Sequence, residues 1–308
     1  DVYIGCTQIH VKSDSVLANP LRWLDLMEQH QVTHSWAPNF GFKLISDSLT
    51  GASDRTWNLR SVKFLMNAGE QVTLPVVSEF LRKTAPFGVR PQAMQPAFGM
   101  AVVCTCMTYQ NQFTPETGVF RFRKSWLGGI LEPAATEDPA AITFVDLGPP
   151  VPGVEIRITD QENRVVPEGV IGRFQIRGAV VTPGYLYNDA ANAEAFVGDG
   201  WFNSGDLGFI LNGRLALTGR EKETIIIRGA NFYCYEIEDV VNSVEGVEPT
   251  FVSSSAVEDP RTGTEALAIF FVPKEEAPGD GTPRAALPDL IRKIKAKVAA
   301  SLGMNPAV

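Results

Sequence analysis

The chain has 308 residues, of which 44% are hydrophobic and 20% charged, a composition typical of a globular protein with one large domain or two smaller ones. Its formal net charge of -8 argues against a general nucleic-acid binder, because neutralising phosphates requires clustered Lys and Arg. Apolar runs stay short of the roughly 18 residues of a membrane span, and the first ten residues lack the pattern of a signal peptide.

A helix is predicted near the start of the chain. Asn19 is a good N-cap residue and Pro20 suits the first helical position, so the following LRWLDLMEQH is expected to be helical. Its apolar residues Leu21, Leu24 and Met27 fall on one face, as in a helix that packs against a core.

The next segments alternate between strand and helix. VTHSWAPNF is strand-like, and a polar Gly/Ser/Asp stretch from Ser46 to Asp54 follows it. SVKFLMNAGEQV predicts a strand that ends in a glycine loop, and PVVSEFLRKTAPFG predicts a helix that Gly88 stops. This rhythm predicts an α/β sheet whose loops meet at one edge.

From about Thr143 the pattern changes to short alternating strands, namely VEIRI, GRFQIR and FILNGRLAL. Turn residues separate them at 160–163, and the Asn212-Gly213 pair favours a type I′ hairpin. The middle of the chain is therefore expected to be a small antiparallel barrel or sandwich.

Past Arg220 the order becomes strand TIIIRG, helix EIEDVVNSV, strand ALAIFFVP and helix LPDLIRKIKAKVAASLG, which predicts a compact α+β module. The last helix carries a basic run at Arg292, Lys293, Lys295 and Lys297. We interpret this run as the solvated face of an amphipathic helix, with docking of an acidic partner as the alternative.

A Gly-Asp turn and a Gly-Arg turn flank the hairpin between WFNSGDLG and LTGRE. The Asp206 carboxylate is able to accept two hydrogen bonds from a ribose 2′,3′-diol, and Arg220 is able to donate to the same hydroxyls. Taken singly, each is an ordinary turn or surface residue. Together on one hairpin, they predict a sugar-binding pair.

WFNSGDLG followed by GREKETIIIRGANFYCYEIE resembles the signature of the adenylate-forming superfamily. THSWAPNFGF, LMNAGEQV, QPAFGMA and GANFYCYEIE look most like fatty acyl-AMP ligases and the acyl-ligase loading domains of polyketide and nonribosomal peptide synthases, over nearly the whole chain. The resemblance implies an α/β fold with part of a large N-terminal domain at residues 1–219, mostly antiparallel β over 143–219. It also implies a hinge at 220–222 and a small mobile α+β domain at 223–308.

The same resemblance assigns a nucleotide site. Phe98 would stack on the adenine, although by itself it is equally a core aromatic. Lys222 would lie in the hinge, and its alternative is an exposed charge. Gly229 would line the channel for a phosphopantetheine arm. The remaining residues expected around the nucleotide are Asn67, Ala68, Gly69, Glu70, Gln95, Pro96, Ala97, Gly99 and Met100, with Asp206 and Arg220 at the ribose.

The acyl pocket implied by the resemblance contains no carboxylate. An ammonium group entering a desolvated pocket normally needs a paired Asp or Glu. Its absence favours a fatty or other non-amino carboxylic acid, although Trp36 and Phe40 are also compatible with a plain core. The residues assigned to this pocket are His34, Ser35, Trp36, Pro38, Asn39 and Phe40.

Three features depart from the family pattern. No Ser/Thr/Gly-rich phosphate loop precedes DVYIGC, which indicates that the chain begins inside a longer protein. The chain also stops at SLGMNPAV, before the Lys expected to neutralise charge at the α-phosphate. Val102 stands where the family has a Glu that holds Mg²⁺, and a valine cannot ligate a hard cation.

The leading hypothesis is an acyl-AMP ligase that uses ATP and Mg²⁺ and passes the acyl group to a carrier-protein thiol. No protein nucleophile is needed, which fits His10, His30 and His34 as structural residues. The alternatives are a catalytically silent scaffold domain and an acyl-coenzyme A synthetase. Four cysteines without zinc spacing or a disulfide framework favour a reducing, cytoplasmic setting.

Overall fold

The computed structural model describes the chain except for residues 1, 2, 4, 52–53, 105, 124–130, 136–137, 139–140, 228–229, 260–263, 275–285, 305 and 307–308. Two compact units emerge, and each draws on two segments. The first comprises Asp1–Phe120 and Thr143–Pro152, and the second Arg121–Ile142 and Gly153–Val308. No helix described in either unit is both long and apolar enough to cross a membrane.

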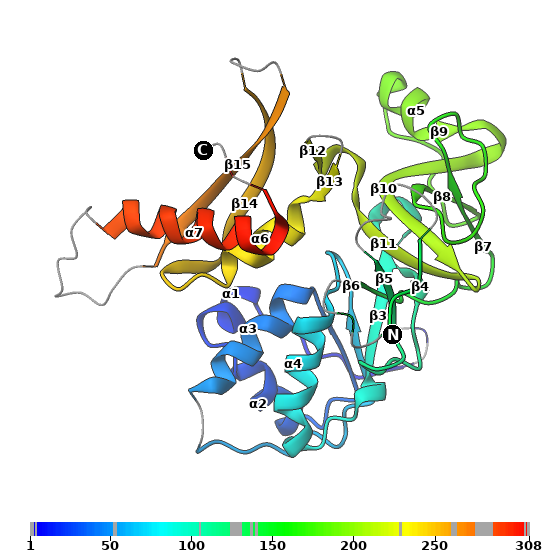
Figure 1. Ribbon diagram of the computed structural model, residues 1–308. Helices are drawn as coiled ribbons and strands as arrows, with labels where there is room; N and C mark the ends of the chain where they lie inside the picture. Colours follow the sequence, from blue (N-terminus) through cyan, green and yellow to red (C-terminus); the bar gives the residue numbers. More distant parts are fainter. Residues whose placement is uncertain are drawn as a thin grey trace. The chain divides into compact units, whose positions relative to one another are not determined.

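The first unit is built on a four-stranded sheet of order β1-β2-β3-β4, drawn from blue to cyan-green in Figure 1. Three strands are parallel, namely β1 (His34–Ala37), β2 (Phe64–Asn67) and β3 (Met94–Gly99), and β4 (Cys106–Tyr109) is antiparallel to β3. The helices are α1 (Ser13–Ala18), α2 (Arg22–Gln29), α3 (Asn39–Thr50) and α4 (Leu74–Thr84), with short 3₁₀ turns η1 (Ala85–Phe87), η2 (Pro91–Ala93) and η3 (Ala101–Val103). The predicted α/β arrangement is confirmed.

The helix α2 starts later than the sequence predicted. Its first residue is Arg22, and the Asn19 side chain makes no cap; instead the Asn19 carbonyl accepts a hydrogen bond from the Arg22 N–H in the preceding turn. Leu24 and Met27 are buried as expected. The end of the next predicted helix is also confirmed, because Gly88 adopts φ +97° directly after η1.

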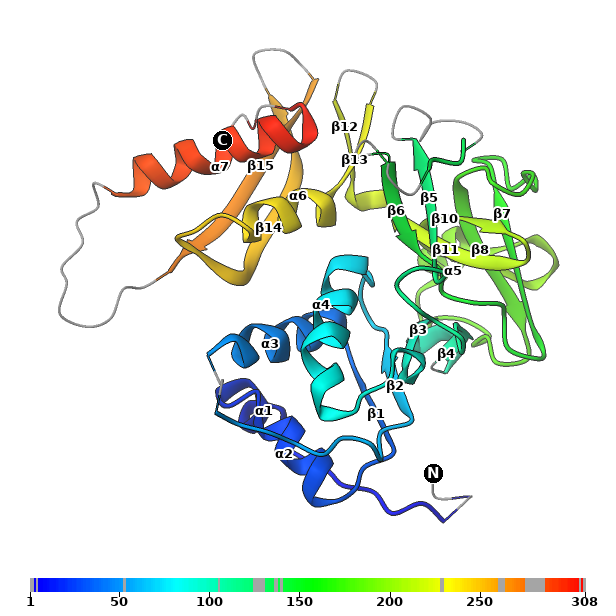
Figure 2. The same cartoon turned by 60° about the horizontal axis from the view of Figure 1, so that its bottom comes forward.

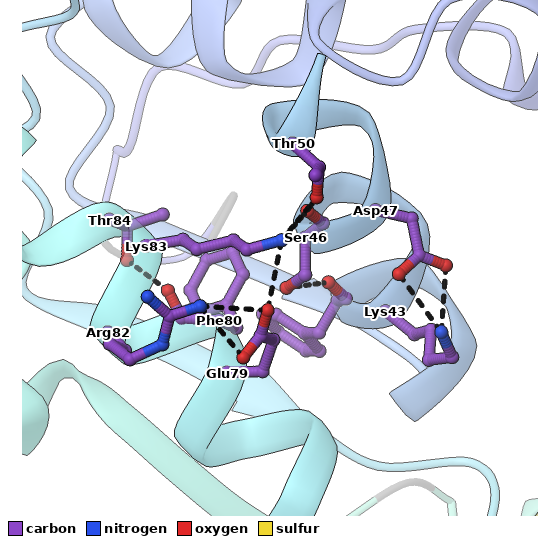
Figure 3. A network of polar contacts seen from close by, with 10 residues as sticks. Lys43, Ser46, Asp47, Thr50, Glu79, Phe80, Arg82, Lys83 and Thr84 are labelled. Carbon is purple, nitrogen blue, oxygen red and sulfur yellow. Dashed lines mark hydrogen bonds and ion pairs between the residues drawn. The ribbon is translucent and has the colours of Figure 1, made fainter. Parts of the chain in front are cut away.

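The helix α3 was not predicted, and the expected polar stretch from Ser46 is its last turn. Phe42 of α3 packs edge-on against Phe80 of α4, with 4.9 Å between ring centroids, and the two helices lie side by side (Figures 1 and 2). Lys83 of α4 donates to the Ser46 carbonyl (2.7 Å) and the Thr50 hydroxyl (2.6 Å), as Figure 3 shows. These bonds satisfy acceptors near the C-terminal end of α3.

The second unit begins with antiparallel β-structure, as predicted. One sheet has the order β11-β10-β8-β7, with the short β9 paired to β10. Asn212 (φ 53°) and Gly213 (φ 70°) form the tight turn between β10 and β11. The elements are β7 (Val154–Thr159), β8 (Gly172–Gly178), α5 (Asp189–Ala195), β9 (Phe196–Val197), η5 (Gly198–Gly200), β10 (Trp201–Leu211) and β11 (Arg214–Arg220). A further pair, β5 (Val119–Arg123) and β6 (Ala141–Val145), contributes residues to both units.

The last part of the second unit is α+β. It comprises η6 (Glu221–Glu223), β12 (Thr224–Ile227), β13 (Ala230–Tyr233), α6 (Cys234–Asn242), β14 (Val247–Asp259), β15 (Thr264–Pro273) and α7 (Ala286–Leu302). Ile237 of α6, Val298 of α7 and Leu267 of β15 meet in a shared core. Both β13 and the long β14 were missed from the sequence. On α7, Lys293 and Lys297 are exposed while Ile294 and Val298 are buried, which agrees with a solvated basic face.

Candidate functional site

The first unit brings three predicted segments to one edge of its parallel sheet. The register places Ala37 beside Asn67 and Asn67 beside Pro96. Because parallel strands end at the same edge, the residues that follow β1 and β2 and the second half of β3 gather there. The predicted acyl-pocket and adenine-site residues therefore share this edge, although their contacts with a ligand remain a prediction.

Two side-chain amides and a hydroxyl meet at the start of α3. The Asn39 side chain donates to the Thr73 hydroxyl (3.2 Å) and accepts from the Asn67 amide (3.2 Å) and the Thr73 N–H (3.4 Å). Asn39 and Asn67 are both buried, and the Asn67 Oδ1 atom has no hydrogen-bond partner. Thr73 was missed in the sequence, although its place directly before α4 marks it as a helix-start residue.

A carboxylate nevertheless reaches this edge from the loop after β2. Glu70 accepts a hydrogen bond from the Phe40 N–H in the first turn of α3. Part of Glu70 is exposed, yet burial of its carboxyl group raises its pKa, and the bond from Phe40 offsets only some of that rise. The carboxyl group thus serves the N-terminal end of a helix, and its neutral form is favoured to higher pH than usual.

The other predicted pocket residues are placed along β1. The ring centroids of His34 and Phe64 are 5.5 Å apart. The Ser35 hydroxyl accepts a hydrogen bond from the Trp23 indole N–H at 3.2 Å. Trp36 is 73% exposed and Phe40 39%, so neither is a core residue of its unit.

The adenine-site residues of β3 are less buried toward the end of the strand. Pro96, Ala97 and Gln95 are buried, and the Gln95 amide donates to the Gln92 carbonyl at 3.1 Å. Phe98, Gly99 and Met100 are half-buried. Phe98 is therefore only partly covered, and stacking on an adenine stays a prediction.

Val102 lies half-buried in η3, directly after β3. Its hydrocarbon side chain offers no oxygen to Mg²⁺. Within the described ranges, no group of three or more His, Cys, Asp and Glu residues is arranged to hold a metal ion. The described residues around Val102 therefore do not fit a divalent-metal site.

The ribose pair is brought together in the second unit. Asp206 of β10 lies directly opposite Arg220 of β11, and the Arg220 Nε atom is 3.5 Å from the Asp206 carboxylate. The Asp206 side chain is 10% exposed and that of Arg220 is 67% exposed. Burial raises the pKa of Asp206 from 3.8 to about 6, and the Arg220 charge opposes that rise.

Ser204 helps to hold the backbone at Asp206 and was not singled out from the sequence. Its hydroxyl accepts from the Asp206 N–H at 3.0 Å and donates to the Phe174 carbonyl of β8 at 2.9 Å. The S-G-D sequence could have indicated this contact, because a serine hydroxyl often accepts a hydrogen bond from the backbone N–H two residues later.

The predicted hinge coincides with η6. Glu221, the middle residue of the predicted hinge, forms an ion pair with Arg173 of β8, with 2.6 Å between Glu221 Oε1 and Arg173 Nη2. Lys222 belongs to η6, but its side chain is not among the described groups, and Gly229 lies outside the described residues. The hinge and the domain boundary at 220–222 remain predictions.

The decisive comparison is with protein families. The family described as AMP-binding enzyme matches residues 2–186. The chain belongs to this family. Its fold is accordingly that of adenylate-forming enzymes, with an antiparallel sheet subdomain as predicted.

Individual members of the AMP-binding family are similar over the whole chain. The nonribosomal peptide synthetase apvA of Aspergillus terreus is 32% identical over 100% of the chain and 31% of its own length. A structure of McyG A-PCP complexed with phenylalanyl-adenylate is 39% identical (TM-score 0.84; 98% of this chain, 50% of that one). A keto acid-selecting NRPS module is 38% identical (TM-score 0.91; 100% and 25%). The chain thus spans about a third of the curated relative and at most half of these structures.

Proposed function

We propose that this chain binds the adenylate in an adenylation domain that joins a non-amino carboxylic acid to AMP. A carboxylate oxygen of the substrate attacks the α-phosphorus of ATP, and pyrophosphate leaves. The observation that carries the proposal is the Asp206–Arg220 pair at the end of one hairpin. Membership of the AMP-binding family supports the same nucleotide and the use of ATP.

The two side chains have complementary tasks toward a ribose. Above pH 6 most Asp206 is ionised, and its carboxylate accepts hydrogen bonds from the ribose hydroxyls. Arg220 donates from its exposed guanidinium to the same hydroxyls. No protein nucleophile takes part, so the chain contributes by binding and positioning the reactants.

We propose an α-keto acid as the substrate class. The Asn39, Asn67 and Thr73 groups at the start of α3 are neutral, and the Glu70 carboxyl group bonds to a helix N–H with its pKa raised. The three neutral groups offer a substrate ammonium no counter-ion, and the one carboxylate at this edge, Glu70, is engaged by the Phe40 N–H. Similarity to a keto acid-selecting module supports this class, whereas the McyG complex makes an amino acid the competing one. A fatty acid remains the alternative among non-amino acids.

The acceptor of the acyl group is proposed to be the phosphopantetheine thiol of a carrier protein in a synthetase. The similarity to a nonribosomal peptide synthetase and to an A-PCP structure supports this acceptor over free coenzyme A. A cytoplasmic location belongs to the same proposal. Offering carrier protein and coenzyme A side by side tests it, and preferential acylation of coenzyme A would defeat it.

Val102 favours a second candidate, a catalytically silent domain that keeps the adenylate site without metal-dependent chemistry. The half-buried valine supplies no ligand where a Glu is expected. In that case nucleotide binding persists while pyrophosphate release does not occur.

Binding of AMP without metal tests the adenylate site under either candidate function. In calorimetric titrations we expect Asp206→Ala to weaken AMP binding at least about tenfold, since it removes a charge-assisted acceptor. Arg220→Ala should weaken it by a smaller factor. Arg164→Ala, at a 74% exposed side chain in the same unit, is the control and should leave binding unchanged. Equal affinity of Asp206→Ala and the parent protein would refute the proposed site.

A further inference from the structure

The β12–β13 hairpin brings a tyrosine back to the segment from which the module begins. The chain leaves β11 at Arg220, passes through η6 and enters β12 at Thr224. The hairpin register pairs Thr224 with Tyr233. Tyr233 therefore lies next to the first residue of β12, although nine positions separate the two in the chain.

Gly219, the residue before Arg220, provides the contact surface for that tyrosine. A Cβ atom at Gly219 would lie 2.7 Å from Cδ1 and 3.3 Å from Cγ of the Tyr233 ring. Gly219 also has φ +148°, a conformation that L-residues rarely adopt. The ring therefore packs directly on the backbone of β11, at a distance that only glycine permits.

Tyr233 is held firmly on the module side. It is 1% exposed, and its ring stacks on that of Tyr235 in the first turn of α6, with centroids 6.0 Å apart and an interplanar angle of 14°. Across η6, Glu221 is ion-paired with Arg173 of β8. The Tyr233–Gly219 contact thus joins the α+β module directly to β11, in addition to the covalent connection through residues 220–222.

We propose that Tyr233 is a positioning residue that holds the C-terminal module in the orientation seen here by packing on Gly219. The proposal rests on the proposed function and on the hinge predicted at 220–222. A rotation about these residues carries β13 away from β11 and must break the contact. Tyr233 and Gly219 therefore set how long the module stays in this orientation before it rotates about the predicted hinge.

The test measures the orientation of the module directly. Spin labels are placed at Leu186→Cys, on the β-sheet part of the second unit, and at Lys293→Cys on α7, with the exposed Cys6 and Cys104 replaced by serine. Distances between the labels are recorded by pulsed electron paramagnetic resonance without ligand. In the parent protein we expect one narrow distance distribution, and in Tyr233→Ala and Gly219→Ala a broad one or a second maximum.

Controls separate positioning from folding. Gly198→Ala adds a Cβ into open space and should keep the narrow distribution. Thermal unfolding shows whether each variant is folded. Because Gly219→Ala changes the β11 side alone, it keeps the test available if Tyr233→Ala fails to fold. Folded variants with the parent's distribution would overturn the proposal, whatever the outcome of the AMP titrations.

Discussion

Asp206 combines a buried carboxyl group with a proposed ribose-binding role that requires its charge. Its pKa is raised from 3.8 to about 6, which corresponds to about 3 kcal/mol against the ionised form in the folded protein. For an acid whose folded pKa is raised, the stabilising contribution is complete below the unfolded pKa and is lost as pH rises through 6. Ribose binding requires the ionised carboxylate, which forms as pH rises. The affinity for AMP should therefore increase with pH while this contribution to stability decreases.

Replacing Asp206 by asparagine should expose this opposition. Asp206→Asn is expected to raise the free energy of unfolding relative to the parent, and the gain should be about 1 kcal/mol larger at pH 8 than at pH 5. Denaturant unfolding at the two pH values measures the difference, and AMP binding should be weaker in the variant. A gain that is the same at both pH values would show that Asp206 does not titrate in this range.

We expect catalytic competence to depend most directly on Val102. Val102→Glu should place an oxygen ligand in η3 and raise Mg²⁺-dependent pyrophosphate exchange with a carboxylic acid. Val102→Gln, of similar size but without the charge, is the control and should not. Exchange that stays absent in Val102→Glu would mean that Val102 alone does not silence the site.

At the scale of elements, one glycine fixes the turn that follows β6. Gly148 has φ +84°, and a Cβ there would lie 2.0 Å from the Tyr109 carbonyl oxygen of β4. Gly153 has nearly the same φ, +86°, but its Cβ would meet nothing within 4 Å. Gly148→Ala should therefore cost about 3 kcal/mol or more of unfolding free energy, and Gly153→Ala only about 1–2 kcal/mol. Urea titrations compare them, and equal losses would show that the clash at Tyr109 is relieved by relaxation.

Lys83 connects α4 to the end of α3. Its ammonium group bonds to Ser46 and Thr50 and pairs with Glu79 at 2.9 Å. Lys83→Met should lower the unfolding free energy by about 1.5–3 kcal/mol, the range for hydrogen bonds to charged groups. Lys43→Met breaks only the exposed pair with Asp47 and should stay within about 0.5 kcal/mol. Similar losses for the two variants would contradict the role of Lys83.

Elements with strong local signals were predictable, and those stabilised by distant partners were not. The β10–β11 hairpin follows from Asn212-Gly213, and this made the Asp206–Arg220 pair predictable as well. The helix α3 begins after Pro38, contains Gly41 and ends in a polar turn, so its sequence gives no clear helical signal. The packing of Phe42 against α4, which stabilises it, is visible only in the structure. The strand β14 contains Pro249 and three serines, and its pairing with β15 is what makes it a strand.

The candidate site also has a part that the sequence predicts and a part that depends on packing between distant segments. That the segments around Asn39, Asn67 and Gln95 would meet follows from the parallel strand pattern. The bond from Phe40 to Glu70 and the amide network with Thr73 depend on side-chain directions set by packing. Sequence spacing carries no information about such directions, so these contacts emerged only from the structure.

At the scale of the whole molecule, the chain divides into two compact units, and each brings together its own set of predicted site residues. The first holds the neutral amide edge after β1, β2 and β3, and the second holds the ribose pair and the α+β module. Membership of the AMP-binding family supports a nucleotide as the ligand. Under the proposed function, this chain binds an acyl-adenylate whose acyl group lacks an ammonium.

The most direct test measures the dissociation constants of hydrolysis-resistant adenosine sulfamates that carry phenylpyruvoyl, phenylalanyl or dodecanoyl groups. No metal is required, so Val102 does not affect the comparison. The α-keto analogue should bind at least about tenfold more tightly than the amino analogue, because an unpaired buried ammonium is costly, and Asp206→Ala should weaken all three. Tighter binding of the phenylalanyl analogue would contradict the claim, and tightest binding of the dodecanoyl analogue would replace the keto acid by a fatty acid.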